Sequence, residues 1–227
     1  MSEFRPVEAS ARELEIMASV RPFTLLSPER LWSVLNAVGY ISRYPIPGAV
    51  VECGVWRGGA MMAAALQLKE YGDFRELYLF DTFEGMTEPT NVDRLSGAAA
   101  PIDWKTEQWD HTWIRAALEE LQSNLSSTGY PKDNIHYIKG DIVQTLDDPK
   151  NIPTQIALLR LDTDWYESTK KELQILYPLI CSGGVLIVDD YGHWEGARKA
   201  VDEYFDNSRT MPFFHYSDYT GRVAIKV

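Results

Sequence analysis

Short apolar segments alternate with longer amphipathic segments over most of the chain, and this alternation limits the fold more than any other feature. Five of the apolar segments are rich in Val, Ile and Leu and have the length of buried strands. They are Ala49–Cys53, Leu77–Asp81, Ile135–Lys139, Ile156–Asp162 and Gly184–Asp189. Strands that are separated by helices usually pair in parallel, so the order predicts a parallel sheet with helices on both faces.

The amphipathic segments predict the helices. One helix precedes the first strand: Ser27-Pro28-Glu29 is a helix-start signature, and Pro45 and Pro47 end the helix. Four more helices are predicted, three of them between the strands and one after the last strand. They span about Gly59–Tyr71, Thr112–Ser126, Thr169–Tyr177 and Gly196–Phe205.

The last part of the chain departs from the alternation. Pro212–Tyr216 and Arg222–Val227 are two strand-like segments that a short Tyr-Thr-Gly turn joins, which predicts an antiparallel hairpin. Five parallel strands closed by such a hairpin resemble the sheet of class I methyltransferases. The expected fold is therefore an α/β, Rossmann-like, seven-stranded sheet with a C-terminal antiparallel hairpin and helices on both faces.

The length of 227 residues fits a single domain over residues 1–227. Within this domain, residues 1–20 are predicted to be a flexible N-terminal tail or a lid. Residues 82–110 have no clear apolar period and contain several Gly, Pro, Asp and Thr residues. Loops of this length inside a domain usually have a function, so we expect a variable loop that binds the substrate.

The charge and the cysteines exclude several classes of protein. Acidic residues outnumber basic residues by 33 to 22, and the net charge of -11 argues against binding to nucleic acid or to an anionic membrane. No apolar window has the length of a membrane span, and the first residues do not resemble a signal peptide, so a soluble, cytoplasmic protein is expected. Cys53 and Cys181 stand alone, which excludes a disulfide framework and a zinc cluster.

A glycine-bearing turn follows the first predicted strand, with glycines at positions 54, 58 and 59. The spacing is not Gly-x-Gly-x-x-Gly and no Lys-Ser or Lys-Thr follows, so a nucleoside without a phosphate tail fits the turn better than a dinucleotide. Glu52 could accept a hydrogen bond from a ligand ammonium group, which S-adenosylmethionine carries. The alternative is that the glycines serve only close packing of strand and helix, with Glu52 in solvent.

Two more acidic residues follow the next two predicted strands. Asp81 is placed to bind the ribose hydroxyls of such a ligand, and Asp141 to receive the adenine amino group. Ligands of open α/β sheets bind at the carboxyl ends of the strands, which favours this assignment. Each acid could instead cap a strand end or lie in solvent as a loop charge.

Four aspartates follow the last two parallel strands. Asp162 and Asp164 come after one strand, and Asp189 and Asp190 after the next. Crowded carboxylates repel one another unless a cation or a proton lies among them, so the pattern predicts a metal ion. Carboxylate oxygens without a nearby cysteine favour magnesium, calcium or manganese over zinc. The alternative is that Asp164 caps the following helix while Asp190 faces water.

Some histidines and tryptophans are further candidates. His193 follows the aspartates and His111 follows the long loop, so either could act as a base or contact the substrate, although most single histidines near loops do neither. Trp104, Trp109 and Trp113 could form the wall of a pocket for an aromatic or sugar acceptor, and simple packing of a lid is an equal alternative.

Four blocks in order resemble the macrocin O-methyltransferase (TylF/MycF/NovP-type) family. The blocks are Val51–Gly59, Asp81–Met86, Leu161–Thr169 and Gly183–Gly192, and the resemblance extends from about Pro22 to the C-terminus. It implies a class I methyltransferase fold, the use of S-adenosylmethionine with Mg²⁺ or another hard divalent cation, and methylation of sugar hydroxyls on antibiotics.

Carried over by motif, the resemblance assigns roles to individual residues. It implies that Asp162, Asp189 and Asp190 bind the metal and that Asp164 is the general base. It also implies cofactor contacts from Glu52, Gly54, Gly58, Gly59, Asp81, Thr82, Phe83, Asp141 and Ile142.

The function expected is metal-dependent transfer of a methyl group from S-adenosylmethionine to a hydroxyl oxygen of a sugar on a natural product. The expected partner is a small-molecule acceptor, a glycosylated natural product, and not nucleic acid or a membrane; whether the chain forms a homo-oligomer stays open. Two alternatives remain, a catechol or phenol O-methyltransferase that uses the same metal site, and a catalytically silent protein that binds S-adenosylmethionine.

Overall fold

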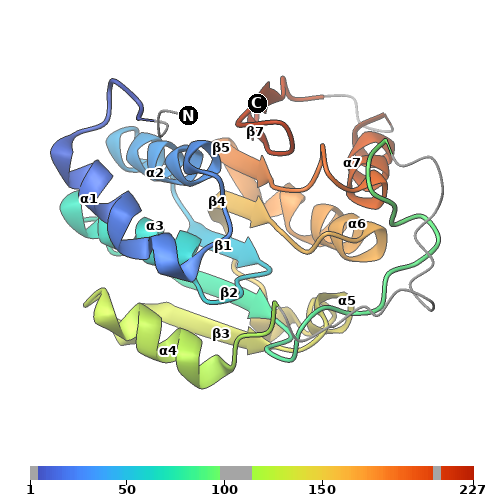
Figure 1. Ribbon diagram of the computed structural model, residues 1–227, viewed down its shortest axis with the longest axis horizontal. Helices are drawn as coiled ribbons and strands as arrows, with labels where there is room; N and C mark the ends of the chain where they lie inside the picture. The colour runs from blue at the N-terminus through green and yellow to red at the C-terminus, as the bar shows by residue number, and fades with distance from the viewer. Residues whose placement is uncertain (1–4, 98–113, 207–210) are drawn as a thin grey trace.

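A seven-stranded sheet runs through the centre of the computed structural model, which describes residues 5–97, 114–206 and 211–227 (Figure 1). The strand order is β3-β2-β1-β4-β5-β7-β6. Strands β1 to β5 are parallel, and β7 is antiparallel to both β5 and β6. This topology confirms the predicted fold. The strands are β1 (Ala49–Cys53), β2 (Leu77–Asp81), β3 (Ile135–Lys139), β4 (Ile156–Leu161), β5 (Ile180–Val188), β6 (His215–Tyr216) and β7 (Arg222–Ile225).

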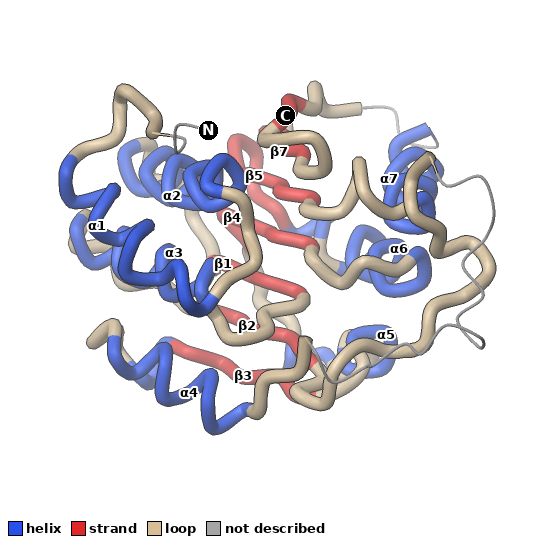
Figure 2. The backbone as a smooth tube through the Cα atoms, in the orientation of Figure 1, coloured by secondary structure: helices blue, strands red, loops and turns tan. Residues whose placement is uncertain are grey.

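The helices form two layers, with α1 to α4 on one face of the sheet and α5 to α7 on the other (Figure 2). Each layer has its own group of buried apolar side chains against the sheet. The helices are α1 (Ala11–Val20), α2 (Pro28–Arg43), α3 (Gly59–Glu70), α4 (Leu118–Ser127), α5 (Ile142–Thr145), α6 (Tyr166–Ile175) and α7 (Glu195–Asp206).

The central strands are buried at every position. All five residues of β1 and all six of β4 are inaccessible to solvent because helices cover both faces of the sheet. Each fully buried aliphatic side chain contributes roughly 1.5–3 kcal/mol relative to its exposed state. The ends of β1 and β4 are therefore rigid supports for the residues that follow them.

Helix α1 lies inside residues 1–20, the range in which a flexible tail or lid is expected. Ser10 Oγ accepts a hydrogen bond from Glu13 N at 3.2 Å, and the Glu13 carboxylate accepts one from Ser10 N at 2.8 Å. This capping box satisfies two backbone donors at the start of the helix. The inner face of α1 then joins the core through Ile16, Met17 and Val20. Residues 11–20 are thus a packed helix and not a tail.

Several element boundaries also differ from the expected ones. Helix α4 begins at Leu118 where a start at Thr112 is expected, and α6 begins at Tyr166, three residues earlier than expected. Strand β5 begins at Ile180, so the two glycines at 183 and 184 lie inside the strand. The four-residue helix α5 has no counterpart in the sequence prediction.

The described part of the expected substrate loop is anchored by one buried acid. Asp93 is 1% exposed, and its Oδ2 accepts hydrogen bonds from Thr90 N at 2.7 Å and Thr90 Oγ1 at 2.8 Å. Its Oδ1 accepts a hydrogen bond at 2.7 Å from Tyr166 N, the first residue of α6. Residues 82–97 are therefore tied to the helix that follows β4.

None of the helices in the described ranges combines the length and the apolar character that a membrane span requires.

Candidate functional site

A cavity of about 450 Å³ opens at the carboxyl ends of the parallel strands. The predicted metal and base residues line it, namely Asp162, Asp164, Asp189 and Asp190. Most of the predicted cofactor residues line it as well, namely Glu52, Gly54, Gly59, Asp81, Thr82, Asp141 and Ile142. Gly58 and Phe83 are not in its wall. The residues from separate motifs thus meet in one space, as the strand-end argument predicts.

The glycine turn is shaped by contacts with other parts of the chain. Gly54 has a φ of 83°, and a Cβ atom there would lie 2.0 Å from the carbonyl oxygen of Asp162. Gly58 has a φ of 85°, and a Cβ atom there would lie 2.3 Å from Leu121 of α4. Both positions combine a left-handed backbone with close packing, so only glycine fits them.

Asp81 holds this turn against the end of β2. Its Oδ2 accepts hydrogen bonds from Val55 N at 2.9 Å and Trp56 N at 3.0 Å, and its Oδ1 accepts one from Phe83 N at 2.8 Å. These amides pin the Asp81 carboxylate in the cavity wall, with further acceptor capacity on Oδ1. Asp81 thus anchors the backbone of the turn. Its binding to ribose stays a prediction.

Asp141 follows β3 and has a similar local role. It is the N-cap of α5, where its Oδ1 accepts a hydrogen bond from Val143 N at 2.9 Å. Asp141 and Ile142 nevertheless line the cavity. Asp141 therefore caps a helix, whereas the sequence left open a strand-end cap or a loop charge in solvent, and this capping role does not remove the residue from the site.

Glu52 is not in solvent, as the packing alternative supposes, but 1% exposed at the end of β1. Its Oε1 forms an ion pair with Arg160, and its Oε2 has no hydrogen-bond partner in the described part of the chain. Burial raises the pKa of Glu52 to about 7, although the charge and hydrogen bond of Arg160 lower it. A buried oxygen without a partner in the cavity wall is the position at which a ligand ammonium group would be bound favourably.

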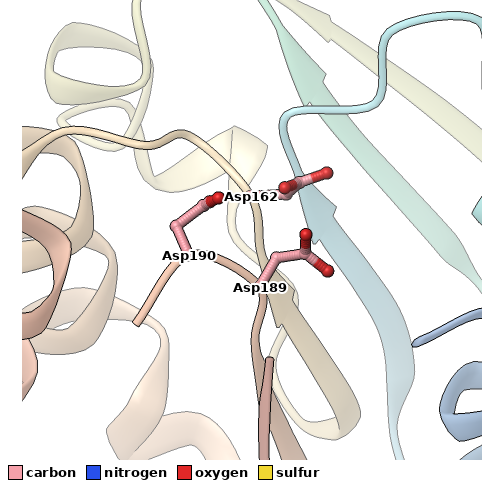
Figure 3. A group of neighbouring side chains, drawn as sticks. All are labelled: Asp162, Asp189 and Asp190. Carbon is pink, nitrogen blue, oxygen red and sulfur yellow. The ribbon is translucent and has the colours of Figure 1, made fainter. Parts of the chain in front are cut away.

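Three aspartates converge at the ends of β4 and β5 (Figure 3). Asp162, Asp189 and Asp190 each offer a carboxylate oxygen, and these oxygens lie within 4.8 Å of one another. Two opposite ligands of Mg²⁺ are about 4.2 Å apart and two of Ca²⁺ about 4.6–5.2 Å. The all-oxygen donor set is of the kind that hard divalent cations prefer, and the limit of 4.8 Å lies within the Ca²⁺ range and above the Mg²⁺ value.

Two arginines compensate part of this negative charge. Arg160 of β4 is 3% exposed and donates to Asp162 Oδ2 at 2.8 Å and to Asp189 Oδ1 at 2.6 Å. Arg30 of α2 pairs with Asp189 Oδ2, and it also donates to Asp218 Oδ2 at 3.0 Å. Asp189 thus has a guanidinium group on each oxygen.

Asp190 and Asp164 have no such arginine partner among the residues that the structure describes. Their carboxyl groups are hydrogen-bonded to each other, and burial together with neighbouring carboxylates raises the pKa of Asp190 well above its usual range. Burial and the charge of Asp162 raise the pKa of Asp164 to about 7. A proton or a cation between the two carboxyl groups stabilises such a pair.

Asp164 does not cap the following helix. Asp93 accepts the hydrogen bond of the first helical amide, while Asp164 Oδ1 accepts one from Trp194 Nε1 at 2.7 Å. Asp164 has a φ of 65°, which is uncommon for a residue other than glycine. Its carboxylate is therefore held beside the metal candidates, where a base would be needed.

The histidine and tryptophan candidates divide into two groups. His193 lines the cavity and interacts through Nδ1 with Tyr219 Oη at 3.0 Å; burial and the charge of Arg30 lower its pKa. His111, Trp104, Trp109 and Trp113 lie outside the described residues. Among the aromatic side chains that line the cavity in the described ranges, Trp165 and Trp194 lie beside the aspartates, with their ring centroids 5.0 Å apart.

Sequence reasoning missed both arginines. The sequence could have indicated that Arg160 has a special role, because it is the only charged residue in the apolar segment Ile156–Leu161. No feature of the sequence singles out Arg30, since a charged residue near the start of an amphipathic helix normally faces solvent. Its carboxylate partner is 159 positions away.

The chain is similar to known proteins over most of its length. Residues 3–221 match the family model described as Macrocin-O-methyltransferase (TylF). The chain is 33% identical over 185 residues to mycinamicin III 3''-O-methyltransferase of Micromonospora griseorubida, covering 81% of this chain and 70% of the relative. It is 32% identical over 184 residues to a tetracenomycin 4'-O-methyltransferase of Streptomyces olivaceus, 8-demethyl-8-(2,3-dimethoxy-alpha-L-rhamnosyl)-tetracenomycin-C 4'-O-methyltransferase, covering 80% and 67%.

Solved structures show the same fold. The O-methyltransferase NovP superposes with a TM-score of 0.75 at 26% identity, covering 90% of this chain and 82% of NovP. The calicheamicin methyltransferase CalS11 superposes with a TM-score of 0.69 at 18% identity, covering 99% and 98%.

Proposed function

The chain belongs to the macrocin O-methyltransferase (TylF) family, and we propose that it transfers the methyl group of S-adenosylmethionine to a sugar hydroxyl of a glycosylated natural product. The names of two relatives identify them as methyltransferases that act on tetracenomycin and mycinamicin compounds, and one name includes a rhamnosyl group. These names support the acceptor class of the proposal.

One observation carries the proposal. A single cavity contains both the unpartnered Oε2 of Glu52, beside the glycine turn, and the aspartate cluster of β4 and β5. Because the cofactor and the acceptor must meet for methyl transfer, two adjoining sets of ligands in one cavity are what the reaction requires.

The residues near β1 to β3 would bind the cofactor. Glu52 Oε2 would accept a hydrogen bond from its ammonium group, and that positive charge favours the ionised form of Glu52. Asp81 and Asp141 lie farther along the same edge of the sheet, where they would face the ribose and the adenine.

Asp162, Asp189 and Asp190 would hold a divalent cation, with Mg²⁺ as the proposed ion. Such an ion supplies a positive charge that favours ionisation of a nearby hydroxyl group. Arg160 and Arg30 keep the two ends of the cluster in place through their hydrogen bonds to Asp162 and Asp189.

Asp164 would act as the general base. A carboxylate with a pKa of about 7 accepts a proton more readily than an ordinary aspartate, and about half of it is ionised at neutral pH. Trp194 Nε1 fixes one oxygen of this carboxylate, which orients the group toward the cavity. Trp165 and Trp194 offer an apolar wall on which the face of a sugar ring would pack.

The test is methyl transfer with a defined set of acceptors. The purified protein is incubated with S-adenosylmethionine and a panel that contains rhamnosylated natural products, their aglycones and simple catechols. Mass spectrometry should detect a gain of one methyl group on the glycosylated compounds only. Methylation of catechols or aglycones instead would refute the sugar acceptor, and cofactor binding without any transfer would favour a silent binding protein.

Two variants test the roles of the aspartates. Asp162→Ala should abolish cation-dependent turnover while cofactor binding, measured by calorimetry, stays largely intact. Unchanged turnover in the presence of a chelator would refute the metal. Asp164→Asn should bind metal and cofactor but lose about 10²–10⁴-fold in kcat, the usual contribution of a general base.

A further inference from the structure

We infer that Glu172 of α6 is a positioning residue, which binds the hydroxyl of Thr163 and thereby fixes the turn Asp162-Thr163-Asp164 that carries the base. This inference rests on the proposed function, because the position of the turn affects turnover only if Asp164 is the general base. Glu172 belongs neither to the proposed cofactor ligands nor to the proposed metal ligands, and it lies on the side of the turn that faces α6.

Glu172 is buried, and no cationic side chain in the described part of the chain pairs with it. It is 0% exposed, and its Oε1 accepts a hydrogen bond from Thr163 Oγ1 at 2.8 Å. Its Oε2 has no hydrogen-bond partner in the described ranges. An apolar side chain of similar size would fill the same volume without the cost of removing a carboxyl group from water. The contact with Thr163 is the one polar contact of this side chain in the described residues that offsets this cost.

The turn needs such a contact because its geometry is unfavourable. Asp164 has a φ of 65°, a left-handed conformation that costs a residue other than glycine about 1 kcal/mol. Asp164 also lies near the carboxylate of Asp162, and like charges repel one another. Repulsion from Asp162 therefore pushes Asp164 away from the place that the structure gives it.

Thr163 is the residue through which the turn is held. On one side of it, Asp162 N donates to Cys53 O at 2.8 Å; on the other, Trp165 N donates to Thr163 O at 2.7 Å. These backbone bonds fix both ends of the turn, and the side-chain bond to Glu172 fixes its middle. The position of Asp164 should therefore depend on Glu172 through Thr163.

The protonation state of Glu172 agrees with this role. Burial raises the pKa of Glu172 to about 8, so the carboxyl group is mostly neutral at pH 7. A neutral group can accept the hydrogen bond from Thr163 without adding a negative charge behind four aspartates. Glutamine has the same shape and a carbonyl acceptor, so it should replace Glu172 in this role.

The experiment compares variants that remove the bond with variants that keep it. Glu172→Met and Thr163→Val remove the acceptor and the donor, whereas Glu172→Gln and Thr163→Ser keep them. Losing the bond should lower kcat about tenfold, the equivalent of ~1.4 kcal/mol, with an unchanged KM for S-adenosylmethionine. The double variant Glu172→Met with Thr163→Val should lose no more than either single variant, because both act through one bond.

A second readout does not depend on activity. Trp194 Nε1 donates to Asp164 Oδ1, so the indole N–H resonance of Trp194 in a ¹⁵N-labelled sample reports the position of Asp164. Trp194→Phe assigns this resonance. It should shift in Thr163→Val and Glu172→Met and stay in place in Glu172→Gln and Thr163→Ser.

Thr128→Val is the matched control. Thr128 is buried in the C-cap of α4, and its Oγ1 donates to Leu125 O at 2.6 Å, away from the site. An equal change of kcat or of the Trp194 resonance in this control would overturn the inference, as would an unshifted resonance in Thr163→Val. If wild-type protein methylates no acceptor, the proposed function fails, whereas the resonance still decides whether Glu172 positions the turn.

Discussion

The two halves of the cavity wall stabilise their acidic residues in different ways. On the β2 and β3 side, Asp81 and Asp141 accept hydrogen bonds from backbone amides that lie within reach of the strand ends. On the β4 and β5 side, Asp162 is paired with Arg160 of β4, Asp189 is paired with Arg160 and with Arg30 of α2, and Asp164 and Asp190 are hydrogen-bonded to each other. Neutral amides hold the acids of the first side, whereas the four aspartates of the second side have only two arginines to balance their charge.

This difference separates two uses of the same residue type. An aspartate that is held by backbone amides shapes the chain around it and contributes a fixed acceptor. Aspartates that are crowded together carry unbalanced charge, which favours protons, cations and metal ions. The variants below test whether changes on the two sides of the cavity lower the free energy of unfolding by different amounts.

The largest effect on stability is expected from Arg160→Met. This change leaves Glu52, Asp162 and Asp189 without their shared guanidinium group in a buried place. Removing one partner of a buried ion pair costs about 3–5 kcal/mol, which urea denaturation would measure as a lower free energy of unfolding. Arg12→Met, at an exposed ion pair, is the control and should show no measurable change. If the two changes lowered the free energy of unfolding equally, the buried ion pairs of Arg160 would contribute no more than the exposed ion pair of Arg12.

Glu52→Gln should change the pH dependence of stability. The pKa of Glu52 is about 7 in the folded protein against 4.5 for an ordinary glutamate, so folding favours the protonated form. The contribution of this group is therefore full below pH 4.5 and is lost as the pH rises through 7.

Denaturation curves at several pH values measure this effect. Relative to Glu52→Gln, the wild-type free energy of unfolding should fall by about 1.4 kcal/mol per pH unit within that window. Parallel pH profiles of wild type and variant would contradict the raised pKa.

Asp81→Ala should cost less than the loss of Arg160. It leaves the amides of Val55, Trp56 and Phe83 without their acceptor, and partial access to water limits the penalty to about 2 kcal/mol. Calorimetry with S-adenosylmethionine should also show weaker binding, because the glycine turn loses its anchor. A variant with wild-type stability and affinity would show that the amides find other partners.

The smallest effect is expected from Asp141→Ala. Asp141 caps the four-residue helix α5 with one hydrogen bond, and the loss of an N-cap costs about 1 kcal/mol. Asp141→Ser should restore most of this stability, since serine is also a good cap. If alanine lowers stability as much as Asp81→Ala does, the role of Asp141 extends beyond the cap.

Most of the sheet could be predicted from the sequence because its signals are local. Strands β1, β2 and β3 have the predicted bounds, since each is an apolar run whose ends are marked by turn residues or charges. The acids at the strand ends could be predicted for the same reason. Because β1 to β5 are parallel, these acids all lie at the same edge of the sheet.

The rest depends on contacts between distant parts of the chain. Helix α6 begins at Tyr166 because Asp93, 73 positions earlier, accepts the hydrogen bond of its first amide. Arg30 reaches Asp189 from α2, and Glu172 has the pattern of a surface charge on an amphipathic helix although it is fully buried. Such partners are separated by most of the fold, so local periodicity does not reveal them.

The two arginines also affect how the newly synthesised chain can fold. Arg30 and Arg160 are part of the chain, so part of the charge of Asp162 and Asp189 is compensated as soon as the chain folds. A newly synthesised chain can therefore complete its sheet in a cell where free divalent ions are scarce. Folding then does not depend on the proposed metal ion, and protein produced in metal-depleted medium should be folded and, under the proposed function, gain turnover when Mg²⁺ is added later.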